Sequence, residues 1–576
     1  MRFKNIVLLA LAASSIVVSS CEKENPDDKK PNHNTPVNPK PPQTGTTDPY
    51  ADLSLYQPLK AYVDREAYPS FKLGVAIDGD AKLYDLAGQN FDEMTAGNAM
   101  KYASVVRSDG SMNFTGVTNF LNAAEARGLT VYGHTLAWHS QQQPAYLNSL
   151  IQDKYVELPG EPGEIIIVES DFENGRHPFN GWGNSMTMSV SDGVFKVTNP
   201  SAVQSWEVQF AYDVTQAFVK DQEYTLSFRI KGSAAGTLSA GFQILDGYKS
   251  AGEFQNTQFT TEWKSVELKC KCSAAGGTRL VFSLGTFAGD IYIDDFKFST
   301  IGKQYEVIAM TPEEQKAALT AEMERWIKGM MEVTATRVST WDVVNEAIAG
   351  QDYDRDGYYD LQKGQPGDMT NFFWQDYIGS IDYVRVAVAS ARKYYAEYGG
   401  TKPLLLFIND YNLESDWDDN KKLRSLINWI QKWEADGVTK IDGIGTQMHI
   451  SYYENPTTQA NKEKHIVQML QLMAATGKLV KISELDMGYV NNQGQTLKTS
   501  ELTERQHRNM AEFYKFIVSK YFEIVPPAQQ YGITQWCPLD SPENTSWRAG
   551  EPTGLWDINY NRKPAYAGFA NGLAGN

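Results

Sequence analysis

Eight short apolar runs alternate with amphipathic segments along most of the chain, and this alternation constrains the fold more than any other feature. Each run is followed by a stretch with helical spacing, such as 311–333. Strands that alternate with helices form parallel sheets, and eight such units are typical of a TIM barrel. The sequence therefore predicts an α/β fold, a TIM (β/α)8 barrel. The runs lie at 71–77, 92–100, 129–138, 337–347, 403–412, 443–450, 478–487 and 531–537.

A second kind of sequence interrupts this pattern between the third and the fourth run. From about 164 to 300, short alternating strands are separated by Gly, Asn, Asp or Ser, and no helical period intervenes. Such a pattern predicts an antiparallel β-sandwich. We expect this all-β sandwich at 161–302, inserted into a barrel formed by 49–160 and 303–576. The insertion lies in a βα loop, on the barrel face where active sites are built.

The first 48 residues show neither pattern. Residues 1–20 have a basic start and an apolar stretch shorter than the ~20 residues of a membrane span, which predicts a cleaved signal peptide. Small residues precede Cys21, which resembles a bacterial lipoprotein signal in which this cysteine is lipidated. An ordinary signal peptide with an incidental cysteine is the alternative. Residues 21–48 are rich in Pro and polar side chains and predict a disordered tether.

Localisation and partners follow from the same features. The acidic run after Cys21 resembles surface-export signals, so we expect export and a lipid anchor in the bacterial outer membrane, at the cell surface. Lys plus Arg is 53 and Asp plus Glu is 70, a net charge of −17, which disfavours binding to nucleic acid. No CxxC pair and no HExxH segment occurs, so the sequence supports no zinc or redox site. We expect a monomer.

Polar residues gather where the predicted barrel strands end, and they include no glycine-rich phosphate loop. Carboxylates, amides, His and Trp suit a neutral polyhydroxy substrate. Glu346 and Glu484 end the fourth and seventh runs, on opposite sides of the barrel mouth. Cleavage of a glycosidic bond needs such a pair of carboxyl groups. A salt bridge or a helix cap is the alternative role for either glutamate.

Six segments of the chain together resemble glycoside hydrolase family 10, the endo-β-1,4-xylanases, over 50–157 and 306–570. They are WDVVNEA (341–347), ISELDM (482–487), HTLAWHSQ (134–141), NDYNLE (409–414), GIGTQMHI (443–450) and NYNRKPAY (559–566). The resemblance implies retaining hydrolysis of internal β-1,4 bonds of xylan, with no cofactor required for catalysis. Glu484 is the implied nucleophile, and Glu346 is the implied acid/base.

The resemblance also implies roles for the neighbours of the two glutamates. His449 would hydrogen-bond the nucleophile and Asp486 would orient that histidine, while Gln447 and Asn345 would position the acid and a substrate hydroxyl. Core filling is the alternative for Trp138 and Tyr411. The residues that correspond to sugar contacts on the glycone side are Asn98, Lys101, His134, Trp138, Gln141, Tyr411, Trp536 and Trp547.

The sequence departs from the family pattern at three places. Gly97 stands where the family has a glutamate that grips sugar hydroxyls beyond the cleavage point. Cys537 replaces a glycine after the eighth strand, and extra residues separate Trp536 from Trp547. None of these changes touches the glutamate pair, so we expect activity with altered affinity for individual sugar units.

The inserted segment resembles carbohydrate-binding modules of the family 4 and 22 type. Trp206 and Tyr212 are our candidates for its sugar contacts, although an aromatic residue in a sandwich is more often part of the core. The resemblance also suggests a structural calcium ion near Glu169, Glu173 and Asp294. The expected ligands of the whole chain are xylan and xylo-oligosaccharides. A β-1,4- or mixed-linkage glucanase and a glycan-capture lipoprotein without activity are the alternatives.

Overall fold

The computed structural model describes residues 50–79, 81–303, 305–365 and 368–575. The predicted signal peptide at 1–20, the lipidated Cys21 and the tether at 21–48 lie outside the described residues. Contacts divide the chain into two compact units, and the second of these is Ile151–Thr311. Within the described part, no helix combines the length and the apolar character that a membrane crossing requires.

The first unit contains a closed barrel of parallel strands. The strands pair in chain order from β1 to β20, β20 pairs with β22, and β23 pairs with both β22 and β1, which closes the ring. The predicted TIM barrel is therefore confirmed. Its strands are β1 (Lys72–Ile77), β2 (Glu93–Ala96), β3 (Thr130–Ala137), β18 (Thr340–Asn345), β19 (Leu405–Asp410), β20 (Gly443–Thr446), β22 (Leu479–Val490) and β23 (Gln530–Gln535).

Each of the eight predicted runs overlaps one of these strands, with two local differences. The sixth run divides, because β20 ends at Thr446 and a separate strand, β21 (His449–Tyr453), pairs only with β22. Asn98 and Lys101, expected on the second strand, lie beyond its end. The reason is that the ladder between β1 and β2 stops at the pair formed by Ile77 and Ala96.

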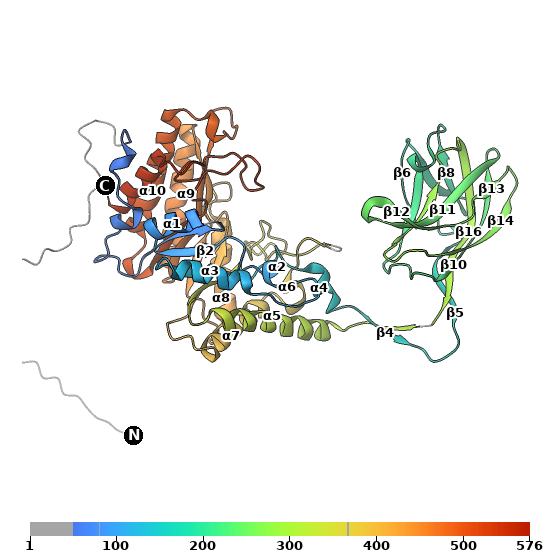
Figure 1. Cartoon of the computed structure of the whole chain (residues 1–576), viewed down its shortest axis with the longest axis horizontal. Helices are drawn as coiled ribbons and strands as arrows, with labels where there is room; N and C mark the ends of the chain where they lie inside the picture. Colours follow the sequence, from blue (N-terminus) through green and yellow to red (C-terminus); the bar gives the residue numbers. More distant parts are fainter. Residues whose placement is uncertain (1–49, 80, 304, 366–367, 576) are drawn as a thin grey trace, which may run out of the picture. The chain divides into compact units, whose positions relative to one another are not determined.

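Helices follow the strands around the barrel (Figure 1). The helix expected at 311–333 is α5 (Pro312–Thr334), where a proline at the first position and two acidic residues in the first turn favour the start. Its buried face includes Trp326 and Met330. The other helices are α1 (Ala81–Asn90), α2 (Tyr102–Val105), α3 (Thr115–Glu125), α4 (Pro144–Ser149), α6 (Trp374–Ile378), α7 (Asp382–Glu397), α8 (Lys421–Glu434), α9 (Pro456–Ala475), α10 (Glu504–Ile524) and α11 (Pro564–Leu573).

A buried ion pair fills part of the barrel interior. Lys481 Nζ lies 3.2 Å from Glu93 Oε1, and Tyr531 donates a hydrogen bond to the other oxygen of Glu93 at 2.8 Å. The ammonium group also lies 3.3 Å from the ring centre of Tyr132. Burial lowers the pKa of Lys481, and the charge of Glu93 opposes that change. The barrel is thus closed below its mouth by packed aromatic and ionic groups.

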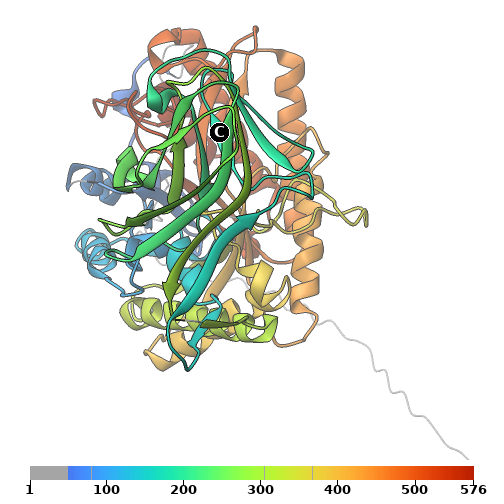
Figure 2. The same ribbon diagram turned by 90° about the vertical axis from the view of Figure 1, so that its right-hand side faces the viewer.

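The second unit is a sandwich of two antiparallel sheets, drawn in green in Figures 1 and 2. Burial alternates along its strands, as the sequence predicts. One sheet contains β14 (Lys264–Lys271), β10 (Glu223–Gly232), β16 (Gly289–Gly302), β8 (Val194–Asn199), β7 (Thr187–Ser191) and β5 (Gly163–Ser170). The other contains β12 (Lys249–Glu253), β11 (Gly236–Ile244), β15 (Arg279–Ser283), β9 (Gln209–Asp213), β6 (Asn180–Trp182) and β13 (Thr257–Phe259).

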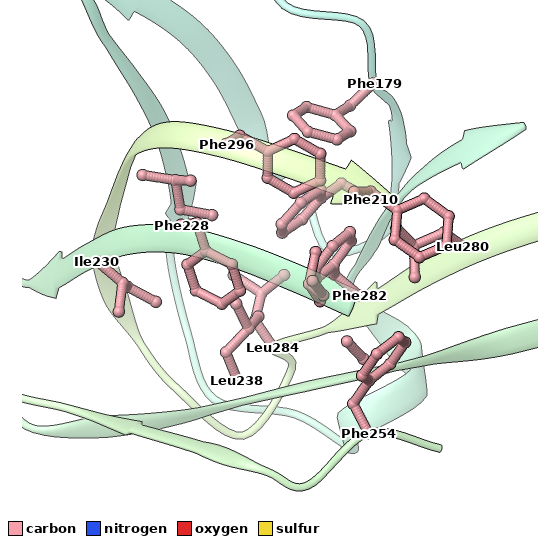
Figure 3. Packing of buried hydrophobic residues seen from close by; sticks show 14 of the residues in the cluster. Phe179, Phe210, Phe228, Ile230, Leu238, Phe254, Leu280, Phe282, Leu284 and Phe296 are labelled. Carbon is pink, nitrogen blue, oxygen red and sulfur yellow. The ribbon is translucent and has the colours of Figure 1, made fainter. Parts of the chain in front are cut away.

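Phenylalanines from both sheets form the core of the sandwich (Figure 3). The rings of Phe210 on β9 and Phe282 on β15 stack with their centres 4.6 Å apart. Phe296 on β16, in the opposite sheet, lies 6.0 Å from Phe282. Offset and edge-on ring pairs of this kind stabilise a core beyond the burial of their area. Much of the aromatic content of the insertion therefore serves packing.

A two-stranded ribbon lies at the chain's entry to and exit from the sandwich. β4 (Lys154–Glu157) and β17 (Tyr305–Ile308) pair antiparallel, with Glu157 opposite Tyr305. The division by contacts places this ribbon with the sandwich, so its limits lie outside the predicted boundaries at 160 and 302. The predicted boundaries stay a prediction.

Candidate active site

Glu484 lies in β22 and its side chain is almost fully buried. Its Oε1 accepts a hydrogen bond from Nδ2 of Asn409 at 2.8 Å, and its Oε2 lies 3.2 Å from Nε2 of His449. Burial alone would raise the pKa of Glu484, but the hydrogen bonds and the positive charge of His449 outweigh burial and lower it. The carboxylate is therefore held ionised.

His449 stands between two buried carboxylates. Its Nδ1 lies 3.1 Å from Asp486 Oδ2, on the side of the ring away from Glu484. Burial would lower the pKa of His449, but the charges of Asp486 and Glu484 raise it to about 10. The ring therefore carries both protons at neutral pH. Asp486 also accepts hydrogen bonds from Arg548 at 2.7 Å and from the indole of Trp547 at 2.8 Å.

Glu346 directly follows β18 and has a φ of 56°, which turns its side chain away from the strand direction. The indole Nε1 of Trp138 donates to its Oε2 at 2.9 Å. Gln447 donates to its Oε1 at 2.9 Å. Two neutral donors thus fix this carboxyl group, in contrast to the charged partner of Glu484.

A chain of amides connects the two glutamates. Nδ2 of Asn409 donates both to Glu484 and, at 3.0 Å, to Oδ1 of Asn345. Asn345 in turn donates to Glu346 at 3.5 Å, and Gln447 donates to Asn345 at 3.3 Å. The orientation of each carboxyl group is therefore coupled to that of the other. The structure brings together all six residues predicted for catalysis.

Lys101 and Trp138 lie beside this pair. Lys101 is buried, and its Nζ lies 5.0 Å from the ring centre of Trp138. Burial lowers the pKa of Lys101, whereas the charges of Glu484, Asp78 and Glu346 act in the opposite direction. The ammonium group is therefore within electrostatic reach of both glutamates. Trp138 bonds Glu346 directly and so lies at the predicted site, and its contact with sugar stays a prediction.

Three further predicted contacts surround His449 and Trp138. The ring of Trp536 lies 5.7 Å from that of His134 and 6.0 Å from that of His449. Trp547 is 40% exposed, and its ring lies 4.6 Å from that of His449. His134 is buried, and its Nδ1 lies 2.8 Å from Asp342. The rings of Trp536 and Trp547 thus both lie beside His449.

For the last three predicted sugar contacts, the structure of the described residues gives no direct contact with either glutamate. Asn98 is exposed and donates a hydrogen bond to Asp78. Gln141 is exposed in the segment after β3. Tyr411 is half-buried, and Nζ of Lys422 lies 3.2 Å from its ring centre.

Sequence reasoning missed two residues that organise the site. Asn409 links Glu484 to Asn345, which itself bonds Glu346, and Arg548 pairs with Asp486. Asn409 opens the strand-end motif NDYNLE, which was the available signal. Arg548 follows Trp547 directly, but nothing local shows that it contacts the seventh strand.

The candidate sugar contacts of the sandwich differ in exposure. Trp206 is 65% exposed, whereas Tyr212 packs against the phenylalanine core. Trp182 on β6 is partly exposed, and the guanidinium of Arg279 lies 5.0 Å from its ring centre. Tyr248 is also exposed. Trp206, Trp182 and Tyr248 are thus the open rings, and Tyr212 is the less accessible of the two predicted residues.

The acidic residues predicted to hold calcium do not form a cluster in the described residues. Asp294 instead pairs with Arg229 at 3.3 Å. The acidic side chains that the described part brings close enough to share an ion are Asp352, Asp354 and Asp356, in the segment after β18. The calcium prediction for Glu169, Glu173 and Asp294 stays a prediction.

Two family patterns match the sequence. Glycosyl hydrolase family 10 matches residues 64–158 and 304–572, and a carbohydrate binding domain matches 165–286, within the gap of the first match. Endo-1,4-beta-xylanase A of Cellvibrio japonicus is 31% identical over 252 residues, which are 42% of this chain and 38% of that protein. Endo-1,4-beta-xylanase D of Talaromyces funiculosus is 29% identical over 262 residues, 45% of this chain and 53% of that protein.

Solved structures agree with the fold. Native xylanase10C from Cellvibrio japonicus has a TM-score of 0.50 at 19% identity, covering 89% of this chain and 72% of that one. Xylanase B from Clostridium stercorarium F9 has a TM-score of 0.50 at 17% identity, covering 90% of this chain and 100% of that one. From the extent of the family match, the chain belongs to glycosyl hydrolase family 10, and a carbohydrate-binding domain is inserted within its barrel.

Proposed function

We propose that the protein hydrolyses internal β-1,4-xylosidic bonds of xylan and xylo-oligosaccharides, with retention of configuration. The observation that carries this proposal is the different treatment of the two glutamates: a charged histidine supports Glu484, and neutral donors hold Glu346. A retaining glycosidase needs one carboxylate that is ionised when it attacks and a second carboxyl group that first gives and later takes a proton. The xylanase names of the relatives support the choice of xylan, although the matched segments span only part of those proteins.

The first step forms a covalent intermediate. Oε1 or Oε2 of Glu484 attacks the anomeric carbon, the bond from that carbon to the glycosidic oxygen breaks, and Glu346 gives its proton to the departing oxygen. Asn409 and His449 each hold one oxygen of the nucleophile, which fixes the direction of attack. Glu346 is left as a carboxylate, hydrogen-bonded to Trp138 and Gln447.

The second step releases the sugar. Glu346 takes a proton from water, the resulting hydroxide attacks the anomeric carbon, and the ester bond to Glu484 breaks. Two inversions at one carbon give net retention. Both catalytic groups return to their starting protonation states, so the cycle requires no cofactor.

The remaining proposals concern the whole protein. We propose that the sandwich holds the polysaccharide while the barrel cleaves it, with Trp206 and Trp182 as contact residues because their rings are exposed. Export, a lipid anchor at Cys21 in the outer membrane and a monomeric state are proposed from the sequence alone. A structural calcium ion near Glu169, Glu173 and Asp294 is likewise proposed from the sequence.

Product analysis tests the activity. Protein lacking residues 1–48 would be incubated with xylan, carboxymethylcellulose and mixed-linkage glucan, and the products separated by chromatography. Glu484→Gln serves as the inactive variant, and Glu523→Gln, which changes an exposed carboxylate on α10, serves as its matched control. We expect short xylo-oligosaccharides from xylan alone, with wild-type and Glu523→Gln protein.

Each other result selects an alternative. Products from the glucans and none from xylan would retain the mechanism but make the protein a glucanase. Retained binding of polysaccharide without products from any of the three would favour the capture lipoprotein. Full activity of Glu484→Gln would overturn the assignment of the nucleophile.

A further inference from the structure

The carboxylate of Asp78 occupies the space that a side chain at Gly97 would need. A Cβ added at Gly97 would lie 2.6 Å from Oδ2 and 3.2 Å from Cγ of Asp78, closer than carbon atoms approach such groups. The two positions are neighbours because Asp78 follows β1 directly and Gly97 follows β2, at the end of a shared ladder. The missing side chain at 97 therefore leaves the space that the Asp78 carboxylate occupies.

Asp78 belongs to a polar cluster at the barrel mouth. Its Oδ2 accepts a hydrogen bond from Nδ2 of Asn98 at 2.7 Å. Its charge also acts on Lys101, together with the charges of Glu346 and Glu484. We call Asp78, Asn98 and Lys101 the glycone cluster. The cluster therefore extends from Lys101, near the two glutamates, to the exposed carboxylate of Asp78 at the end of β1.

The chemistry of Asp78 suits recognition of a sugar. A carboxylate accepts several hydrogen bonds, and Asn98 uses one position on Oδ2. The side chain is exposed, so vicinal hydroxyls can reach the remaining positions. Hydrogen bonds from hydroxyls to an ionised acceptor are stronger than those between neutral groups.

We propose that Asp78 binds the hydroxyls of the second sugar unit on the glycone side, and so supplies from β1 the carboxylate that position 97 lacks. The proposal rests on the proposed function for its substrate class. It makes Asp78 a determinant of specificity: the residue acts on substrates that are long enough to reach it. A residue that merely supports Asn98 would influence short and long substrates alike.

Two aryl glycosides separate these roles. Asp78→Ala should lower kcat/KM for an aryl β-xylobioside about ten- to a hundredfold, the loss expected for a charged hydrogen-bond partner. The same variant should lower kcat/KM for an aryl β-xyloside, which has no second unit, by a much smaller factor, because Asp78 then acts only through its charge on Lys101. Asp85→Asn, at another exposed carboxylate beyond β1, is the matched control and should change neither value. Equal losses on both substrates, or no loss on either, would overturn the proposal.

An exchange of positions provides a second test. Gly97→Glu alone should lower activity on the xylobioside, because its Cβ displaces Asp78 and two carboxylates repel each other. The same substitution in the Asp78→Ala background should raise activity, because the carboxylate then returns from the other strand. If Gly97→Glu lowers activity equally in both backgrounds, Asp78 does not supply the carboxylate that position 97 lacks.

Binding distinguishes failure of this proposal from failure of the proposed function. Calorimetry with xylobiose would compare Glu484→Gln with Asp78→Ala/Glu484→Gln. Loss of affinity in the double variant supports the role of Asp78 even if wild-type protein hydrolyses no substrate. Unchanged affinity refutes the role even if the protein is an active xylanase.

Discussion

His449 lies 3.2 Å from Glu484 and holds this carboxylate with a ring that is protonated on both nitrogens. The opposite nitrogen faces Asp486, which Arg548 also contacts. Glu551 also pairs with Arg548, at 2.9 Å, so carboxylates and cations alternate through this cluster. Because each charge is compensated by neighbours, removal of one member leaves a buried charge without its partner.

The first prediction concerns this cluster and pH. The folded-state pKa of His449, about 10, exceeds its unfolded value of about 6.5, so the histidine stabilises the fold fully below pH ~6.5 and loses this effect as pH rises towards 10. The difference in thermal midpoint between wild type and His449→Gln should therefore shrink from pH 6 to pH 10.

His507→Gln provides a control of opposite sign. Burial lowers the pKa of His507 to about 4, so its contribution is lost as pH falls from about 6.5 to 4 and is constant above. The difference in thermal midpoint between wild type and His507→Gln should stay constant between pH 7 and pH 10. A constant difference for His449→Gln over that range would contradict the charged state of His449.

The second prediction separates the roles of the two glutamates. Glu346→Ala should lower kcat/KM on xylan about a thousandfold, because the departing sugar oxygen needs a proton. On aryl glycosides with good leaving groups the loss should be below about tenfold, since that departure needs little protonation. Glu484→Gln should lose activity on both substrates. Similar losses for Glu346→Ala on both would reject the acid/base assignment.

The third prediction concerns the interior of the barrel. Lys481→Ala leaves Glu93 buried without its cation and should reduce the free energy of unfolding by about 3–5 kcal/mol. Lys520→Ala, which removes an exposed pair with Glu523, should cost about 0.5 kcal/mol or less. Urea unfolding measures both. Equal small losses would show that the buried pair contributes no more than a surface pair.

The fourth prediction uses the ribbon to remove the sandwich. Since Glu157 and Tyr305 are opposite each other, an Asn-Gly turn that replaces 158–304 should close β4 and β17 into a hairpin. The shortened protein should hydrolyse short xylo-oligosaccharides at the wild-type rate but bind insoluble xylan less tightly, as a sedimentation assay would show. A parallel loss on short substrates would mean that the barrel depends on the insertion.

Local sequence patterns were sufficient to predict the order of strands and helices along the chain. The alternation of runs predicted the barrel and the sandwich because periods of 2 and 3.6 residues report which face of an element is buried. Strand-end position alone also indicated Glu346 and Glu484. The likeness in sequence then related His449 and Asp486 to Glu484, and the structure places these three in one cluster.

Contacts between strands that are distant in sequence could not be predicted in this way. Arg548 meets Asp486 and Asp78 approaches Gly97 through the reach of particular side chains, which no local period encodes. The exposure of Trp206 and the partial burial of Tyr212 likewise depend on how two sheets pack. Resemblance to a family identified Gly97 as a departure, but only the fold brings the carboxylate of Asp78 beside it.

The β4–β17 ribbon has a consequence for biosynthesis. About 150 residues emerge from the ribosome between the two strands of this ribbon, and as a flexible loop they would raise the closure cost by about 3 kcal/mol over a five-residue link. A sandwich that folds as a unit during translation returns its ends to adjacent positions. The third and fourth barrel strands are then joined through a short hairpin and not through a long flexible loop. The order of synthesis therefore favours folding of the sandwich before the barrel closes.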